Sequence, residues 1–214
     1  PINAILMDLG WSSPQFAERG RGFSFQTDEV LNMRYDGFCH SERSEESLSQ
    51  SPNGQRSFVP LRMTTQTAAD IVNSYSEQEL AGVFKNFGEE KLSKEIAEAI
   101  ADYRKNKKLE KTDELTGIIL QVYRTKLHSD KEIPWIGGLH PATKVYQALR
   151  MEVNHELENL KQVLPQAIEV LSAGGRLAII SFHSLEDRIV KHYFKSIANK
   201  QSLKLRQGSK EENK

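Results

Sequence analysis

Polar side chains follow two apolar runs of this sequence, at positions where chemistry is possible. Asp8 follows the mostly apolar run 2–7, and Ser181-Phe182-His183-Ser184 follows the run 177–180. Both runs are typical of buried strands, and in open parallel sheets ligands bind beyond the carboxyl ends of the strands. A carboxylate there accepts hydrogen bonds from an amine or a ribose; alternatively, Asp8 caps a turn or a helix. We therefore expect the functional site at these two strand ends.

Residues able to bind a metal are sparse. Cys39 is the single cysteine, which excludes an internal disulfide framework and a cysteine metal cluster and favours a reducing cytoplasm. His140 and His183 could be interpreted as metal ligands, but no matching spacing of histidines or carboxylates accompanies them. The sequence therefore predicts no metal site.

The charge of the chain is balanced, with 29 basic and 29 acidic residues among 214. A generic polyanion binder usually has a basic excess, so RNA contacts would have to come from a local patch. The best candidate is the segment 104–111, which includes Lys105, Lys107 and Lys108 and has five positive charges against one negative. An equally good interpretation is a solvated loop between helices.

The first third of the chain contains a strand, a loop and a low-complexity segment. Residues 2–8 are predicted as a buried strand and residues 10–37 as an ordered loop, and together residues 1–37 form the first part of a core. Residues 38–63 hold six serines from Ser41 to Ser57 and no periodic pattern, so they are interpreted as an insertion. We expect no catalytic residue in this insertion.

The middle of the chain, residues 64–134, is predicted to form a helical subdomain of three or four helices, because its apolar residues recur at helical spacing. Ser76 and Glu79 form a capping box, and Thr112 is placed to cap a later helix. The apolar stripes of these helices are interpreted as core.

Residues 135–198 are predicted as the second part of the core. A long helical stretch runs over 142–171, with a kink or a second helix start at Pro165, and the glycines at 174 and 175 end it. A buried strand over 176–182, a helix over 185–197 and a frayed polar tail over 199–214 follow. Parallel strands joined by helices predict an α/β sheet into which the helical subdomain is inserted.

Seven short motifs of the sequence resemble, in order, those of the MraW family, also called the RsmH family, of small-subunit ribosomal RNA methyltransferases. These motifs are Asp8-Leu9-Gly10-Trp11-Ser12-Ser13-Pro14-Gln15, Arg21-Gly22-Phe23-Ser24-Phe25, Asn32-Met33-Arg34-Tyr35-Asp36, Phe87-Gly88-Glu89-Glu90, His140-Pro141-Ala142-Thr143, Tyr146-Gln147-Ala148-Leu149-Arg150 and Ser181-Phe182-His183-Ser184-Leu185-Glu186-Asp187-Arg188-Ile189-Val190-Lys191. The resemblance covers residues 1 to about 195, interrupted by the serine-rich insertion.

The resemblance implies a class I, Rossmann-like methyltransferase sheet with an inserted all-α subdomain. It implies transfer of a methyl group from S-adenosylmethionine to the N4 amine of a cytidine in 16S ribosomal RNA. The cofactor contacts of the family then correspond to Asp8 and Gln15.

The reaction also needs a proton acceptor and contacts to RNA. Ser12, Ser13, Ser181 and His183 are candidate acceptors by position alone. Lys105, Lys107, Lys108 and Arg150 are the candidate RNA contacts. Trp11, Phe23 or Phe25 could stack on an unstacked cytidine, although plain packing of the loop explains each ring as well.

Some features depart from the family pattern. The first strand of the family and its glycine- and histidine-containing loop have no counterpart, so we expect truncation and an incomplete cofactor site. Lys144 and His155 stand where arginine and an acid are expected. Two alternatives therefore stay open, namely a non-catalytic RNA-binding or ribosome-assembly fragment and an inactive product of a disrupted gene.

Overall fold

The computed structural model describes residues 2–9, 20–35, 66–128 and 139–211, with side chains described through Asn199. The chain divides into two compact units. Residues 1–11 and 156–214 form one, called here the sheet unit, and residues 12–155 form the other, called the helical unit. The predicted insertion 38–63 lies outside the described residues.

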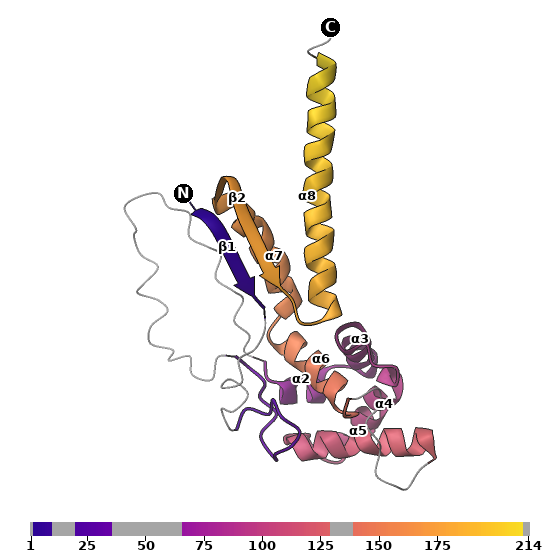
Figure 1. The fold of residues 1–214 in the computed structure, drawn as a ribbon. Helices are drawn as coiled ribbons and strands as arrows, with labels where there is room; N and C mark the ends of the chain where they lie inside the picture. Colours follow the sequence, from indigo (N-terminus) through magenta and orange to yellow (C-terminus); the bar gives the residue numbers. More distant parts are fainter. Residues whose placement is uncertain (1, 10–19, 36–65, 129–138, 212–214) are drawn as a thin grey trace. The chain divides into compact units, whose positions relative to one another are not determined.

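The sheet unit contains two adjacent parallel strands and two helices. Strand β1 (Ile2–Asp8) pairs with β2 (Leu171–Ile180), and the helices are α7 (Glu156–Val170) and α8 (Ser184–Glu211) (Figure 1). A parallel pair of strands cannot be joined by a tight turn, so the chain leaves β1 and returns through α7. The expected combination of parallel strands and helices is confirmed.

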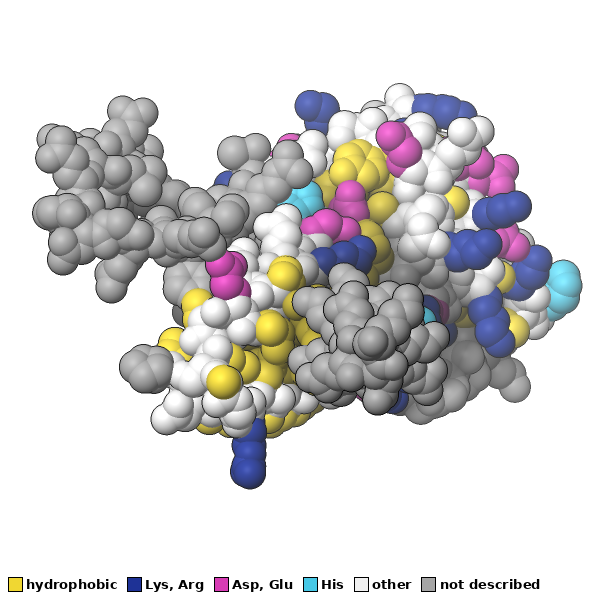
Figure 2. Space-filling view, turned by 90° about the horizontal axis from the view of Figure 1, so that it is seen from above, with side chains coloured by type: hydrophobic (Ala, Val, Ile, Leu, Met, Phe, Trp, Pro, Cys, Tyr) yellow, Lys and Arg dark blue, Asp and Glu magenta, His cyan; other side chains and the backbone are white. Residues whose placement is uncertain are grey.

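Among the described residues, one face of this sheet is covered. Leu160 and Leu164 of α7 and Val190 of α8 form a small core against which Ile179 packs. On the opposite face, the exposed fractions are 69% for Leu6 and 44% for Ile180. Figure 2 shows hydrophobic side chains reaching the surface of the molecule. The prediction that both strands are buried was therefore wrong, because a continuous apolar run does not reveal whether one or both faces of a strand have neighbours.

Strand β2 begins earlier than predicted. The pairing with β1 shifts from Ile2 opposite Leu171 to Ala4 opposite Arg176, so the intervening residues form an irregular stretch within the strand. Gly174 has a φ of +79° there, which glycine adopts without strain. The two glycines predicted to end a helix therefore shape the start of the strand instead.

In the part of the helical unit that the structure describes, five helices pack around a larger core. Their bounds are α2 (Ala68–Ser74), α3 (Glu77–Gly88), α4 (Ser93–Tyr103), α5 (Thr112–Leu127) and α6 (Thr143–Val153). Four of these helices, α2 to α5, lie between residues 66 and 128. The fifth, α6, comes from the stretch assigned by sequence to the second part of the core, and Val145, Ala148 and Leu149 are fully buried in the helical unit.

Helix starts follow local rules in one case and long-range contacts in another. The capping box of Ser76 and Glu79 is confirmed at the start of α3. Thr112 is instead the first residue of α5, where its hydroxyl donates to Thr27 O at 2.7 Å and accepts from Glu29 N at 2.8 Å. The prediction that Thr112 caps this helix was wrong, because the Thr112 hydroxyl is hydrogen-bonded to the backbone of residues 27–29.

The long predicted helix 142–171 is two helices, but the break is not at Pro165. The chain leaves α6 at Asn154 and His155, where His155 has a left-handed φ of 49°, and α7 then runs through Pro165. The last helix also differs, since α8 extends to Glu211 instead of ending near residue 197. Its final turns are rich in Lys, Gln, Leu and Glu, which favour a helix without tertiary support. Among the described helices, none has the length and apolar character needed to cross a membrane.

Candidate active site at the strand ends

The carboxyl ends of β1 and β2 lie side by side in the sheet unit. Asp8 is opposite Ile180 in the register, and Leu9 N donates to Ile180 O at 3.1 Å. Asp8 is exposed, and Ser181, which follows Ile180 directly, is half-buried. The structure therefore brings together the two strand ends that the sequence singled out.

A histidine–carboxylate pair lies directly after β2, with His183 half-buried and Glu186 buried. His183 Nε2 lies 3.2 Å from Glu186 Oε1, and the other oxygen of Glu186 accepts from Phe182 N at 3.0 Å. Burial acts to raise the pKa of the Glu186 carboxyl, but the His183 imidazole and the Phe182 N–H act the other way, so this pKa lies below its usual value. Glu186 is therefore a buried anion held at the first turn of α8, where a negative charge is also favoured by the helix dipole.

Glu156, the first residue of α7, completes a cluster with this pair. One ligand atom from each of Glu156, His183 and Glu186 lies within 4.8 Å of the others. Carboxylates and imidazole are ligands for Zn²⁺ and Mn²⁺. However, His183 Nδ1 accepts from Glu186 N at 3.4 Å, so the neutral ring carries its proton on Nε2. In this tautomer the Nε2–H faces Glu186, so binding of a cation through Nε2 would require the ring to give up the hydrogen bond from Glu186 N.

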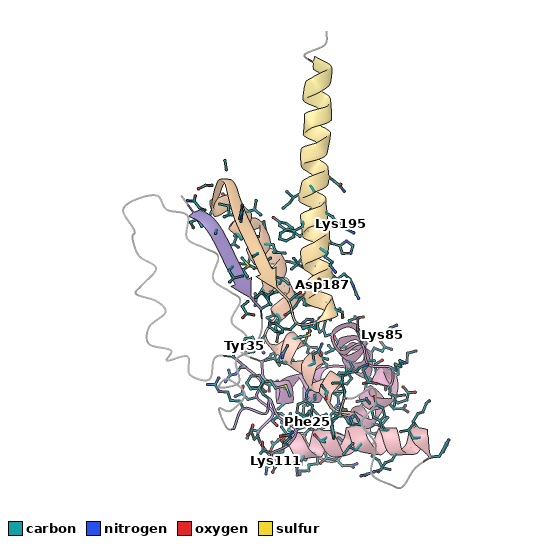
Figure 3. The ribbon with its side chains drawn as sticks, in the orientation of Figure 1. Phe25, Tyr35, Lys85, Lys111, Asp187 and Lys195 are labelled. Carbon is teal, nitrogen blue, oxygen red and sulfur yellow. The ribbon has the colours of Figure 1, made fainter. Side chains whose placement is uncertain are left out.

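Of the other residues predicted from the sequence, some lie outside the described part of the chain and some belong to the helical unit. Trp11, Ser12, Ser13 and Gln15 lie outside the described residues. Phe23 and Phe25 belong to the helical unit, where both pack against its core. The Phe25 ring stacks on His140 with centroids 4.4 Å apart (Phe25 is labelled in Figure 3).

The candidate RNA contacts lie in the helical unit. Lys105 Nζ lies 2.6 Å from Asp102 Oδ1, and Lys107 pairs with Glu114. Lys108 is exposed beside them, and Arg150 lies in the last turn of α6. The structure therefore joins Lys105, Lys107 and Lys108 in one exposed loop after α4 and places Arg150 on a separate element.

Glu156 and Glu186 are site residues that the sequence reasoning missed. Glu186 lies in the motif that follows β2, three residues after His183. Residues three apart are neighbours on a helix. That spacing was a usable signal. Glu156 had none, because its proximity to His183 results from the packing of α7 beside α8.

Comparison with known proteins identifies the family. The profile of the MraW methylase family matches residues 1–50 and 59–213. The chain is 43% identical over 196 residues to the ribosomal RNA small subunit methyltransferase H of Sulfurihydrogenibium sp. strain YO3AOP1, covering 91% of this chain and 55% of the relative. It is 41% identical over 194 residues to the protein of that name from Persephonella marina, with 91% and 55% covered. The chain thus spans about half the length of the curated relatives it matches. This chain belongs to the MraW methylase family.

Proposed function

We propose that this chain forms part of an S-adenosylmethionine-dependent methyltransferase that modifies the N4 amine of a cytidine in small-subunit ribosomal RNA, in the cytoplasm. The relatives named above support the reaction class, because they are named as methyltransferases of the small-subunit ribosomal RNA. The observation that carries the proposal is that Asp8 lies opposite Ile180, the residue before Ser181, at the carboxyl ends of two adjacent parallel strands. In a class I methyltransferase sheet with an inserted helical subdomain, this edge is where the cofactor and the substrate amine meet.

Asp8 and Gln15 are the proposed cofactor contacts. The Asp8 carboxylate is exposed at the end of β1, where it can accept hydrogen bonds from a ribose hydroxyl or an amine. When bound, S-adenosylmethionine supplies the sulfonium methyl group. The protein contributes position and exclusion of water, because the cytosine amine is conjugated into its ring and is a poor nucleophile.

The amine must lose a proton after it accepts the methyl group. Ser12, Ser13, Ser181 and His183 are the candidate acceptors, and the cluster adds Glu156, which is half-buried. His183 Nε2 is buried and faces Glu186, while its Nδ1 accepts the Glu186 N–H. We therefore propose that His183 positions Glu186 and the turn after β2, and does not itself contact the substrate.

The cofactor assignment is tested by calorimetric titration with S-adenosylmethionine and with its demethylated product. The chain is titrated alone and then together with the half of the Sulfurihydrogenibium relative that it does not match. Asp8→Ala should reduce cofactor affinity at least tenfold, because it removes the hydrogen-bond acceptor at the strand end. Asp102→Ala, which removes an exposed carboxylate of the helical unit, is the matched control. Equal affinities for the two variants would refute the role of Asp8.

The reaction itself is tested by methyl transfer to small-subunit RNA in the same mixture. Transfer that produces N4-methylcytidine supports the proposal. RNA binding without cofactor binding or methyl transfer would replace it with the alternative, a non-catalytic RNA-binding or ribosome-assembly fragment.

A further inference from the structure

The turn between β2 and α8 carries a large apolar side chain that is open to solvent. Phe182 lies in this turn, two residues beyond the end of β2, and is 67% exposed. The turn belongs to the sheet unit, where the chain passes from the end of β2 directly into α8 (Figure 1). A large apolar side chain that is left exposed does not contribute the stabilisation that its burial would give. The exposure of Phe182 therefore does not serve the packing of the described sheet unit.

The backbone that carries this ring is fixed by a buried anion. Phe182 N donates to Glu186 Oε2 at 3.0 Å, and Glu186 is buried. His183 Nε2 lies 3.2 Å from the other carboxylate oxygen, and His183 O accepts from Asp187 N at 3.2 Å. The turn is thus tied to the first turn of α8 on both sides of the ring-bearing residue. A ligand that contacts the Phe182 ring consequently meets a backbone that is already ordered, which lowers the entropy cost of binding.

The ring lies at the edge of the sheet where the proposed reaction takes place. Ile180, two residues before Phe182, is opposite Asp8 in the register, and Leu9 N donates to Ile180 O at 3.1 Å. Ser181, a candidate proton acceptor, precedes Phe182 directly. In a parallel sheet this edge is the ligand-binding edge. An exposed aromatic ring is therefore next to the position expected for the substrate amine.

The aromatic residues that the sequence suggested for stacking on the cytidine do not lie at this edge in the part of the chain that the structure describes. Phe23 and Phe25 belong to the helical unit and pack against its core, and Trp11 lies outside the described residues. Phe182 was not considered for this role from the sequence, because it stands at the end of an apolar run that reads as buried strand. Its exposure became evident only from the structure.

The chemistry of an unstacked base fits this ring. A cytidine that presents its N4 amine to a methyl donor has left the stack of its neighbours, and its apolar faces then need a new partner. Phenylalanine has no polar atom in its side chain, so it supports the base without competing for the amine. We propose that Phe182 stacks on the cytosine that is methylated and positions its amine at the strand ends. The inference rests on the proposed function, because that function supplies the cytidine.

The first test is binding of a short oligocytidylate to the full chain with isotope-labelled phenylalanine, followed by nuclear magnetic resonance. We expect upfield shifts of the cytosine ring protons, because protons above an aromatic ring are shielded. Phe182→Ala should weaken binding about fivefold to a hundredfold, the range for loss of one base–aromatic stack. Phe182→Trp should retain the affinity, whereas Phe182→Leu, which keeps apolar bulk without a ring, should weaken it as Ala does.

Several outcomes would overturn the proposal. These are no binding of oligocytidylate to the unaltered chain, unchanged affinity in Phe182→Ala, or full affinity in Phe182→Leu. Phe194→Ala is the matched control, since Phe194 is a partly exposed phenylalanine of α8, eleven residues beyond the start of the helix region at His183. An equal loss of affinity in this control would show only general apolar contact with RNA and would also contradict the proposal.

A second titration separates the substrate base from the adenine of the cofactor, which is also flat. The demethylated product of S-adenosylmethionine is titrated into the same variants mixed with the half of the Sulfurihydrogenibium relative that the chain does not match. Its affinity should be the same for Phe182→Ala and the unaltered chain. A loss for this ligand without a loss for oligocytidylate would assign the ring to the cofactor and overturn the proposal. Because the oligocytidylate titration contains no cofactor, its failure is distinct from a failure of cofactor binding at Asp8.

Discussion

Asn154 Oδ1 accepts a hydrogen bond from Tyr35 N at 2.9 Å, although the two residues are 119 positions apart in the sequence. Asn154 Nδ2 donates to Met33 O and to Arg150 O, both at 2.8 Å. Met33 has a left-handed φ of 57°, which a residue with a side chain adopts at a cost. The Asn154 amide therefore holds the segment around Met33 in place against the end of α6.

Replacing Asn154 with Asp should destabilise the helical unit by about 1–3 kcal/mol, because the carboxylate can accept from Tyr35 but cannot donate to Met33 O or Arg150 O. Urea denaturation measures the loss, and hydrogen exchange at the Tyr35 amide locates it. Asn106→Asp, at an exposed position, should change the stability by less than about 0.5 kcal/mol. Unchanged exchange at Tyr35 would contradict the role given to Asn154.

Two glycine substitutions in helices should have opposite effects. A Cβ on Gly88 would lie 2.5 Å from Lys144 O, because α3 and α6 approach closely there. Gly88→Ala should therefore destabilise the helical unit by about 1–3 kcal/mol. Gly117, within α5, has no atom within 4 Å of such a Cβ, and Gly117→Ala should stabilise the unit by about 0.5–1 kcal/mol. Thermal melting compares the two, and a stabilising Gly88→Ala would refute the close approach.

The stability of the helical unit should fall as the pH is lowered from 7 to 5.5. Burial lowers the pKa of His140 in the folded state below its usual value of 6.5. The neutral ring accepts from Ala142 N through Nδ1 at 3.2 Å, a bond that protonation removes. The contribution is therefore present above the unfolded pKa and is lost as the pH falls through the folded pKa. His140→Gln does not titrate and should flatten this slope in denaturation measured at each pH. A slope equal to that of the unaltered chain would exclude His140 as its source.

The exposed basic loop after α4 should contribute to RNA binding through phosphate contacts. Lys105 and Lys107 are paired with Asp102 and Glu114, but exposed ion pairs are weak, so phosphates can compete for these lysines. Changing Lys105, Lys107 and Lys108 together to Gln should reduce the log–log salt slope of single-stranded RNA binding by about 2. Filter binding at several salt concentrations measures this slope.

The control for this prediction is a triple Gln variant of Lys85, Lys94 and Lys195, exposed lysines of α3, α4 and α8. It removes the same charge from positions outside the loop. Equal slopes for the two triple variants would remove the loop from the RNA footprint.

Features that depend on neighbours in the sequence could be predicted without the structure. The capping box of Ser76 and Glu79 closes within a single turn, so both residues and their spacing are visible in the sequence. The strand that ends at Asp8 is similarly evident, because an apolar run stopped by an acid is a local pattern. The seven motifs, which occur in the order typical of the MraW family, also predicted the family, and the comparisons confirm it.

Features that depend on distant residues were decided by the tertiary structure. The break between α6 and α7 lies at Asn154 and not at Pro165, because Asn154 bonds to a segment far away in the sequence. Leu6 is exposed because packing, and not hydrophobicity, determines which face of a strand is covered. Glu156 reaches His183 only through the packing of α7 beside α8. The sequence by itself thus determined the helices, the strand ends and the family. Contacts between residues far apart along the chain, which no local spacing encodes, decided where helices break and which side chains meet.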